Sequence, residues 1–163
     1  MDAIEAIKTR RSVRRYLPTP VPREVIEDIV DCGRMAPTAR GDQPWEFIVV
    51  TDQKTREALA AVATWGKFIA DAPVCVAVFA RPTPRYVEDC SAAVENMLLA
   101  AHAHGLGTCW VAGHDTSYAP EIGRILGVPT SHRLVALFPV GYHEDKPIAH
   151  KRSLSDVLHW ERY

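Results

Sequence analysis

The spacing of apolar residues predicts a chain in which helices and strands alternate. Asp2 is placed to cap a first helix that begins at Ala3. Pro22 is placed as the first residue of a second helix, which ends near Gly33. Three more helices are predicted: from the cap Asp52 through residue 63, over residues 86–104, and over residues 119–126. Residues 86–104 contain no Gly or Pro, so they are expected to form the longest helix.

Four segments have the composition of strands: residues 45–50, 73–80, 107–113 and 134–142. Residues 73–80 are apolar almost throughout, which is typical of a strand buried on both faces. Pro139 predicts that the last strand is an edge strand or contains an irregularity. Helices alternating with four strands indicate an α/β or α+β sandwich, followed by a tail over residues 144–163 that becomes amphipathic.

Composition narrows the class of protein. The chain has 163 residues, of which 47% are hydrophobic and 24% charged, so we expect one globular domain over residues 1–163. The net charge of −1 gives no overall field that would attract nucleic acid or a membrane surface. Four cysteines without a C-x-x-C pair argue against a zinc ribbon or a thioredoxin. With no signal segment and no spanning stretch visible, we expect a cytoplasmic protein.

The first candidate for binding chemistry is the basic run Arg10-Arg11-Ser12-Val13-Arg14-Arg15. Guanidinium groups match phosphate oxygens in a bidentate way, and a serine hydroxyl adds a donor. The run therefore predicts a phosphate site, although a solvated basic loop is about as well supported by the run alone. A nucleic-acid-binding module, with Trp45, Trp65 and Tyr16 available for stacking, is a third interpretation.

Two further segments could contact a flat ligand. Residues 36–45 form a polar loop bracketed by prolines, which suits the polar edge of a heterocycle or simply connects two elements. Residues 105–113 are rich in glycine but lack the G-x-G-x-x-G pattern and follow a helix, which excludes a dinucleotide fingerprint. Gly113 nevertheless permits a flat ligand to approach the backbone closely.

No side chain stands out as a catalyst or a metal ligand. His102 and His104 are two residues apart on a predicted helix, so they point to different faces. Cys90 and Cys109 have no accompanying Cys–His–Asn signature and are expected to be small buried residues. Ser12 lacks the G-x-S-x-G elbow of a serine hydrolase.

Taken together, these segments resemble the short form of the nitroreductase family of FMN-dependent oxidoreductases, over essentially the whole chain. Residues 7–14 are similar to its opening helix and R-R-S-x-R motif. Residues 36–39 and 43–47 resemble its A-P-S and Q-P-W-x-F segments, and residues 105–110 match G-L-G-T-C-W. The tail, residues 154–161, also resembles that of the family.

The resemblance implies an α+β homodimer with a central, mainly antiparallel sheet flanked by helices and an exchanged C-terminal tail. Two FMN molecules would lie in the interface. Carried over by position, Arg10, Ser12 and Lys151 would bind the FMN phosphate. The other implied contacts are Arg11 at the phosphate or ribityl end, Arg14 at the pyrimidine side, Pro37, Thr38 and Ala39 from the partner, Gly113 through its N–H near the reactive ring nitrogen, and Gln43 and Arg152.

The resemblance also implies a ping-pong mechanism in which NAD(P)H and then a nitroaromatic, quinone or similar acceptor occupy one site, with no catalytic side chain because the flavin does the chemistry. Gly41 stands where the family usually has Asn, and Thr38 replaces Ser. The chain lacks room for large insertions after residues 80 and 113, so we expect an open substrate pocket. Alternatives are a specialised flavin enzyme, such as a dehalogenating one, and a flavin binder without turnover.

Overall fold

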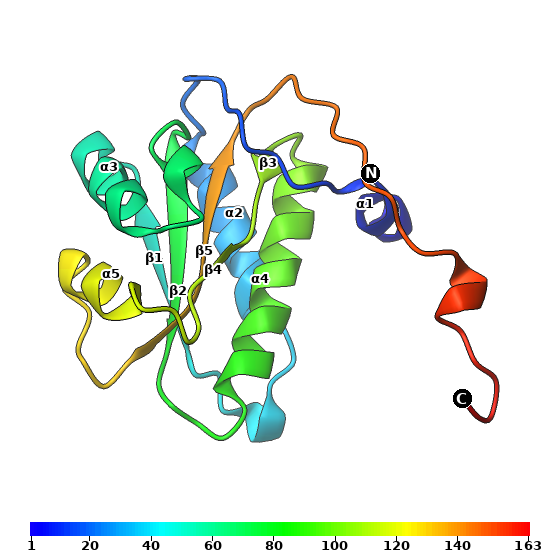
Figure 1. Cartoon of the computed structure of the whole chain (residues 1–163). Helices are drawn as coiled ribbons and strands as arrows, with labels where there is room; N and C mark the ends of the chain where they lie inside the picture. Colours follow the sequence, from blue (N-terminus) through cyan, green and yellow to red (C-terminus); the bar gives the residue numbers. More distant parts are fainter.

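The computed structural model describes residues 1–163, with five α-helices and five strands (Figure 1). The helices are α1 (Ala3–Thr9), α2 (Arg23–Arg34), α3 (Gln53–Val62), α4 (Tyr86–Ala103) and α5 (Ala119–Ile125). The strands are β1 (Trp45–Val50), β2 (Val74–Ala80), β3 (Gly107–Thr108), β4 (Val111–Ala112) and β5 (Arg133–Gly141). None of the helices is both long and apolar enough to cross a membrane.

The predicted helix caps form. Asp2 Oδ1 accepts the N–H of Glu5 at 2.9 Å, and Asp52 Oδ2 accepts the N–H of Thr55 at 2.8 Å. Each bond satisfies one of the N–H groups that the first turn leaves unpaired. Helix α2 begins at Arg23, one residue later than predicted, so Pro22 is its cap residue and not its first helical residue.

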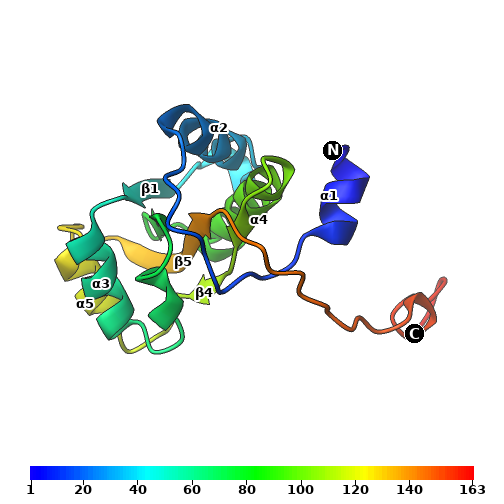
Figure 2. The same cartoon turned by 90° about the horizontal axis from the view of Figure 1, so that it is seen from above.

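The strands form one sheet in the order β1-β2-β5-β3, and β4 also pairs with β5. All of these pairings are antiparallel. Helices α2 and α4 cover one face and α3 and α5 the other (Figures 1 and 2). Every position of β2 is buried as a result, as its apolar sequence predicts. The predicted α+β sandwich is confirmed.

The predicted strand over residues 107–113 is two short strands, β3 and β4, interrupted at Cys109 and Trp110. The alternative of an edge strand, drawn from Pro139, is wrong, because β5 lies between β2 and the β3/β4 pair. The alternative of an irregularity is confirmed. Pro139 pairs with Cys75 of β2, and its other side faces the gap between β3 and β4, where its missing N–H breaks no ladder.

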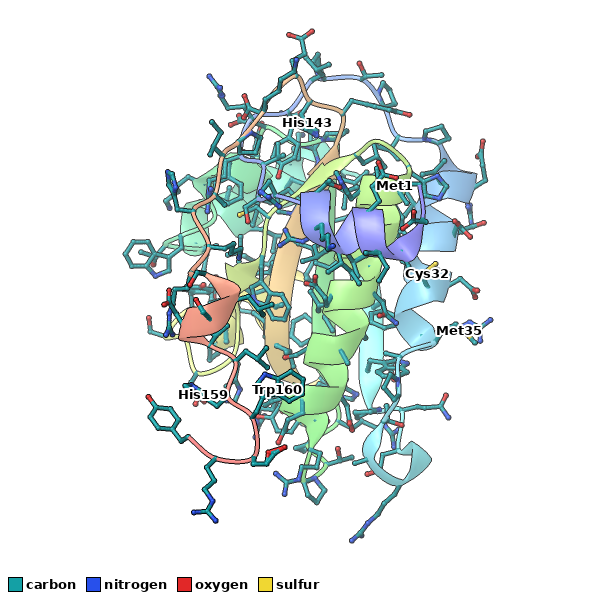
Figure 3. The ribbon with its side chains drawn as sticks, turned by 90° about the vertical axis from the view of Figure 1, so that its right-hand side faces the viewer. Met1, Cys32, Met35, His143, His159 and Trp160 are labelled. Carbon is teal, nitrogen blue, oxygen red and sulfur yellow. The ribbon has the colours of Figure 1, made fainter.

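Two segments stand apart from the sandwich. The tail leaves the sheet after β5 and is exposed from residue 146 onward, with only a short 3-10 helix at Leu154–Asp156 (Figures 1 and 2). Ile4 and Ile7 of α1 are also exposed. Figure 3 shows α1 and the tail, with its labelled Trp160, on the same side of the molecule. This side therefore presents apolar side chains that nothing in the chain covers.

Candidate functional site

The basic segment that follows α1 is fixed against the edge strand β3. The N–H of Val13 donates to the carbonyl oxygen of Thr108 at 2.8 Å, and Ser12 forms a parallel bridge with the same residue. Val13 is buried and anchors the segment, so the residues on either side of it lie at fixed positions near the surface. The side chains gathered at this point are called the cationic cluster: Arg10, Arg11, Ser12, Arg14 and Lys151.

The five members of the cationic cluster line one hollow of about 260 Å³. Pro147, Ile148 and Ala149 of the tail complete its wall. Both ends of the chain therefore contribute to the hollow, with Lys151 reaching it from the C-terminal side. Arg152 does not line it, because its Nη2 donates to the carbonyl oxygen of Asp156 at 2.6 Å.

The positive charge of the cationic cluster is poorly neutralised. Its one ion pair joins Arg10 Nε to Glu95 Oε1 at 3.6 Å. Arg11 donates only to the carbonyl oxygens of Lys8 and Arg10, at 2.9 and 2.8 Å. Several guanidinium and ammonium groups beside a hydroxyl, without matching carboxylates, form a donor set that fits a phosphate group.

Arg14 has a different environment from the rest of the cationic cluster. Its guanidinium lies over the ring of Phe68, 5.9 Å from the centroid, a cation–π arrangement that restricts its position. Cys109 lies nearby, and burial raises the pKa of its thiol, while Arg14 and the hydroxyl of Ser12 oppose that shift. Cys109 is buried, as the sequence predicts.

The other predicted contact loop, with Pro37, Thr38, Ala39 and Gln43, lies at the opposite end of the sheet. This loop leads into β1, whose first residue pairs with the last residue of β2. The cationic cluster lies instead near the first residue of β2, because β3 pairs with the end of β5. Six steps along β2 separate the two ends by about 20 Å. One chain therefore does not bring these two groups of predicted residues together.

The loop explains why glycine is acceptable at position 41. Gly41 has φ +73°, within a turn where Arg40 and Gln43 also have positive φ, +57° and +42°. Glycine and asparagine are the residues that adopt this left-handed conformation most readily. Gly41 therefore suits the conformation of this turn, and it lacks only the amide side chain of the Asn that the resemblance implies here.

Asp89 contacts this loop, and the sequence did not predict that contact. Its side chain on α4 is 5% exposed, and Oδ1 accepts the N–H of Ala39 at 2.9 Å. Oδ2 is buried without a partner. The signal in the sequence is an acidic residue on the otherwise apolar face of a long helix. Asp89 therefore anchors the loop to α4 from within the fold.

Replacing Asp89 with Ala should lower the free energy of unfolding by about 1–3 kcal/mol, because the part-buried N–H of Ala39 would lose its acceptor. Asp89→Asn keeps an acceptor oxygen and should lose less. Glu88→Ala, on the exposed neighbour, is the matched control and should change stability very little. Urea unfolding of the three variants measures this order, and equal effects of Asp89→Ala and Glu88→Ala would contradict the anchoring role.

The role predicted for Gly113 needs correction. Its N–H donates to the carbonyl oxygen of Val135 at 3.1 Å, so it is not available to a ligand. A Cβ at this position would lie 2.6 Å from Leu134 Cγ and 2.9 Å from the carbonyl carbon of Val135. The glycine is therefore explained by the close approach of β5, rather than by the approach of a flat ligand.

His102 and His104 point to different partners, as predicted. His102 Nε2 lies 2.8 Å from Thr9 Oγ1, and His104 Nε2 lies 2.7 Å from Asp28 Oδ2. Burial lowers the pKa of His102, and the positive charge of Arg10 lowers it further. The chain has no group of three His, Cys, Asp or Glu side chains that could hold a metal ion.

Comparison with known proteins identifies the family. The model of the Nitroreductase family matches residues 7–73 and 63–142. The chain belongs to the nitroreductase family. A relative in Methanothermobacter thermautotrophicus, named "Putative NADH dehydrogenase/NAD(P)H nitroreductase", is 36% identical over 100% of this chain and 88% of its own length.

Solved nitroreductase structures agree with this fold over nearly the whole chain. An "FMN-dependent Nitroreductase" from Clostridium difficile R20291 superposes with a TM-score of 0.92 at 28% identity, covering 98% of this chain and 99% of that one. A "putative nitroreductase in complex with fmn" from Desulfovibrio desulfuricans superposes with a TM-score of 0.89 at 29% identity, covering 100% and 99%. The predicted family, fold and general class, an NAD(P)H-dependent oxidoreductase, are confirmed.

Proposed function

We propose that this protein is an FMN-dependent oxidoreductase that oxidises NAD(P)H and reduces nitroaromatics, quinones or similar electron-poor acceptors by a ping-pong mechanism. The observation that carries the proposal is the hollow lined by the cationic cluster, whose poorly neutralised donors suit the phosphate of FMN. The names of the solved relatives, one FMN-dependent and one in complex with FMN, support this cofactor.

The side chains of this chain bind and position the cofactor. Arg10, Ser12 and Lys151 would hold the phosphate, and Arg11 would assist at the phosphate or ribityl end. Arg14, held over Phe68, would place a positive charge beside the pyrimidine ring. Bound FMN would supply the redox chemistry, so no acidic or basic side chain needs to act as a catalyst.

The site would be completed by a second copy of the chain. Pro37, Thr38, Ala39 and Gln43 lie about 20 Å from the cationic cluster along the sheet, so they would contact the FMN of the partner subunit. The exposed apolar residues of α1 and the tail supply a surface for such a homodimer. We propose one domain, residues 1–163, in each subunit.

The nucleic-acid alternative loses support because its stacking residues are not available together. Trp45 is half-buried and stacks on Phe47 with 6.0 Å between ring centroids, and the hydroxyl of Tyr16 donates to the carbonyl oxygen of Val13. Of these three residues only Trp65 is largely exposed, at 74%. A specialised flavin enzyme is also less favoured, because the segments 81–85 and 113–118 are too short to form a cover over a substrate.

Reconstitution followed by steady-state kinetics tests the proposal. The folded protein should take up FMN, with the flavin absorbance bands remaining after removal of free cofactor. It should then oxidise NADH or NADPH in the presence of a nitroaromatic or a quinone. Parallel lines in double-reciprocal plots are expected for a ping-pong mechanism. If the protein binds FMN but does not oxidise NAD(P)H, it is a flavin-binding protein and not an oxidoreductase. If the folded protein does not bind FMN, the proposal is overturned.

A further inference from the structure

Arg56 of α3 is a buried cation whose charge is only partly compensated. The residue is 7% exposed, and its Nη1 donates to the carbonyl oxygens of Ala70, at 3.0 Å, and Ala72. It forms no ion pair with any carboxylate. Its Nε is sealed from solvent and has no acceptor. Two carbonyl dipoles are a weak substitute for an anion, because a buried charge is costly without a paired one.

One donor of Arg56 remains open. Nη2 makes no hydrogen bond within the protein, and unlike Nε it is not sealed from solvent. Arg56 lines a cavity of about 470 Å³, within the range typical of small-molecule sites. The cavity shares no lining residue with the hollow of the cationic cluster. It is therefore a separate place on the molecule, and what it binds does not depend on the proposed function.

Three parts of the chain meet around this cavity at the end of the sheet where β2 begins, at the top of Figure 1. They are the proline-rich connection before α2, the start of α3, and the segment leading into β2. Besides Arg56, six of the residues that line the cavity determine what it can bind: Pro18, Pro20, Thr51, Gln53, Asp71 and Pro73. The prolines give an apolar surface, and Thr51 and Gln53 add polar side chains to the wall. The Nε2 of Gln53 donates to Glu57 Oε1 at 2.8 Å.

We propose that this cavity binds a small organic acid with a single carboxylate, anchored by Arg56. The open Nη2 can donate to a carboxylate oxygen, and such charge-assisted bonds are the stronger ones. Asp71 in the wall repels negative charge, which favours a monoanion over a phosphate dianion. The prolines pack against the carbon part of the acid.

Sodium benzoate is a suitable probe, titrated into the FMN-saturated protein and followed by the amide resonances of Thr51, Gln53 and Ala72. Saturable shifts at these amides are expected. Gln53→Glu places a carboxylate one turn from Arg56 and leaves the bonds of Arg56 to Ala70 and Ala72 in place. It should weaken benzoate binding at least tenfold, because the new carboxylate competes for the guanidinium.

The matched control is Ala61→Glu, which adds the same charge at an exposed position of α3 outside the cavity. It should bind benzoate like the wild type. The proposal is overturned if benzoate shifts only resonances near the flavin, or if Gln53→Glu and the wild type bind it equally. Tighter binding of inorganic phosphate than of benzoate at these amides would contradict the assignment to monocarboxylates.

Discussion

Removing residues 154–163 should convert the proposed FMN-binding dimer into a monomer or an aggregate that does not retain FMN. The tail exposes Leu154 and Trp160 to 71% and 80%, and Val157 and Leu158 are also exposed. Burying side chains of this size contributes about 1.5–3 kcal/mol each, before the cost of ordering the tail and joining two chains is subtracted. An apolar tail without a covering partner in its own chain is best explained by contact with a second chain.

Size-exclusion chromatography with light scattering, combined with flavin absorbance, measures both effects. The matched control removes only residues 161–163, which leaves the four apolar side chains in place and should preserve the dimer and its FMN. A chain truncated before Leu154 that stays dimeric and yellow would refute the role given to the tail.

Arg10→Ala and Arg14→Ala should produce different defects, although both remove a cation from the same cluster. Arg10 faces the hollow assigned to the phosphate, so its loss should weaken FMN binding by roughly 1.5–3 kcal/mol, or about 10- to 150-fold. The flavin potential should change little, because the phosphate is remote from the redox ring. Arg14→Ala should instead lower the flavin potential, because its positive charge stabilises the negative charge gained on reduction.

Hydride transfer from NAD(P)H should also slow in Arg14→Ala, even at saturating FMN. Arg14→Lys should restore much of the potential, since charge matters there more than the shape of the guanidinium. FMN titration and a spectroelectrochemical midpoint potential for all three variants make the comparison. If Arg10→Ala and Arg14→Ala changed affinity alone and left the potentials equal, the assignment of Arg14 to the pyrimidine side would be wrong.

The elements of the fold were predictable because their signals are local. Asp2 and Asp52 cap the helices that follow them, and the apolar run of β2 is buried on both faces, as short-range patterns require. Pro139 shows where local patterns are insufficient. Its missing N–H permits an edge strand or a gap in a neighbouring strand, and only the order of the sheet decides between them.

The site was predictable to the extent that it lies in one stretch of chain. Arg10, Arg11, Ser12 and Arg14 are neighbours in the sequence, and Lys151 joined them only through the family resemblance. Asp89 was missed because its partner, the N–H of Ala39, is a backbone group distant in sequence and unmarked by residue type. Gly113 was assigned to a ligand because a glycine needed for close strand packing has the same sequence signal as one needed for a ligand.

We propose that each FMN site combines the cationic cluster of one chain with the loop of the other. Arg10→Ala with Ser12→Ala disables the first part, and Ala39→Trp fills the space expected of the second. Each variant dimer alone should lack FMN.

Refolding the two variants together, as an equimolar mixture, tests whether the two chains share each site. About one quarter of the sites should bind FMN, because half of the random dimers are mixed and each has one intact site of two. Recovery of no FMN by mixed dimers of normal size would place both parts of the site in the same chain and contradict the account.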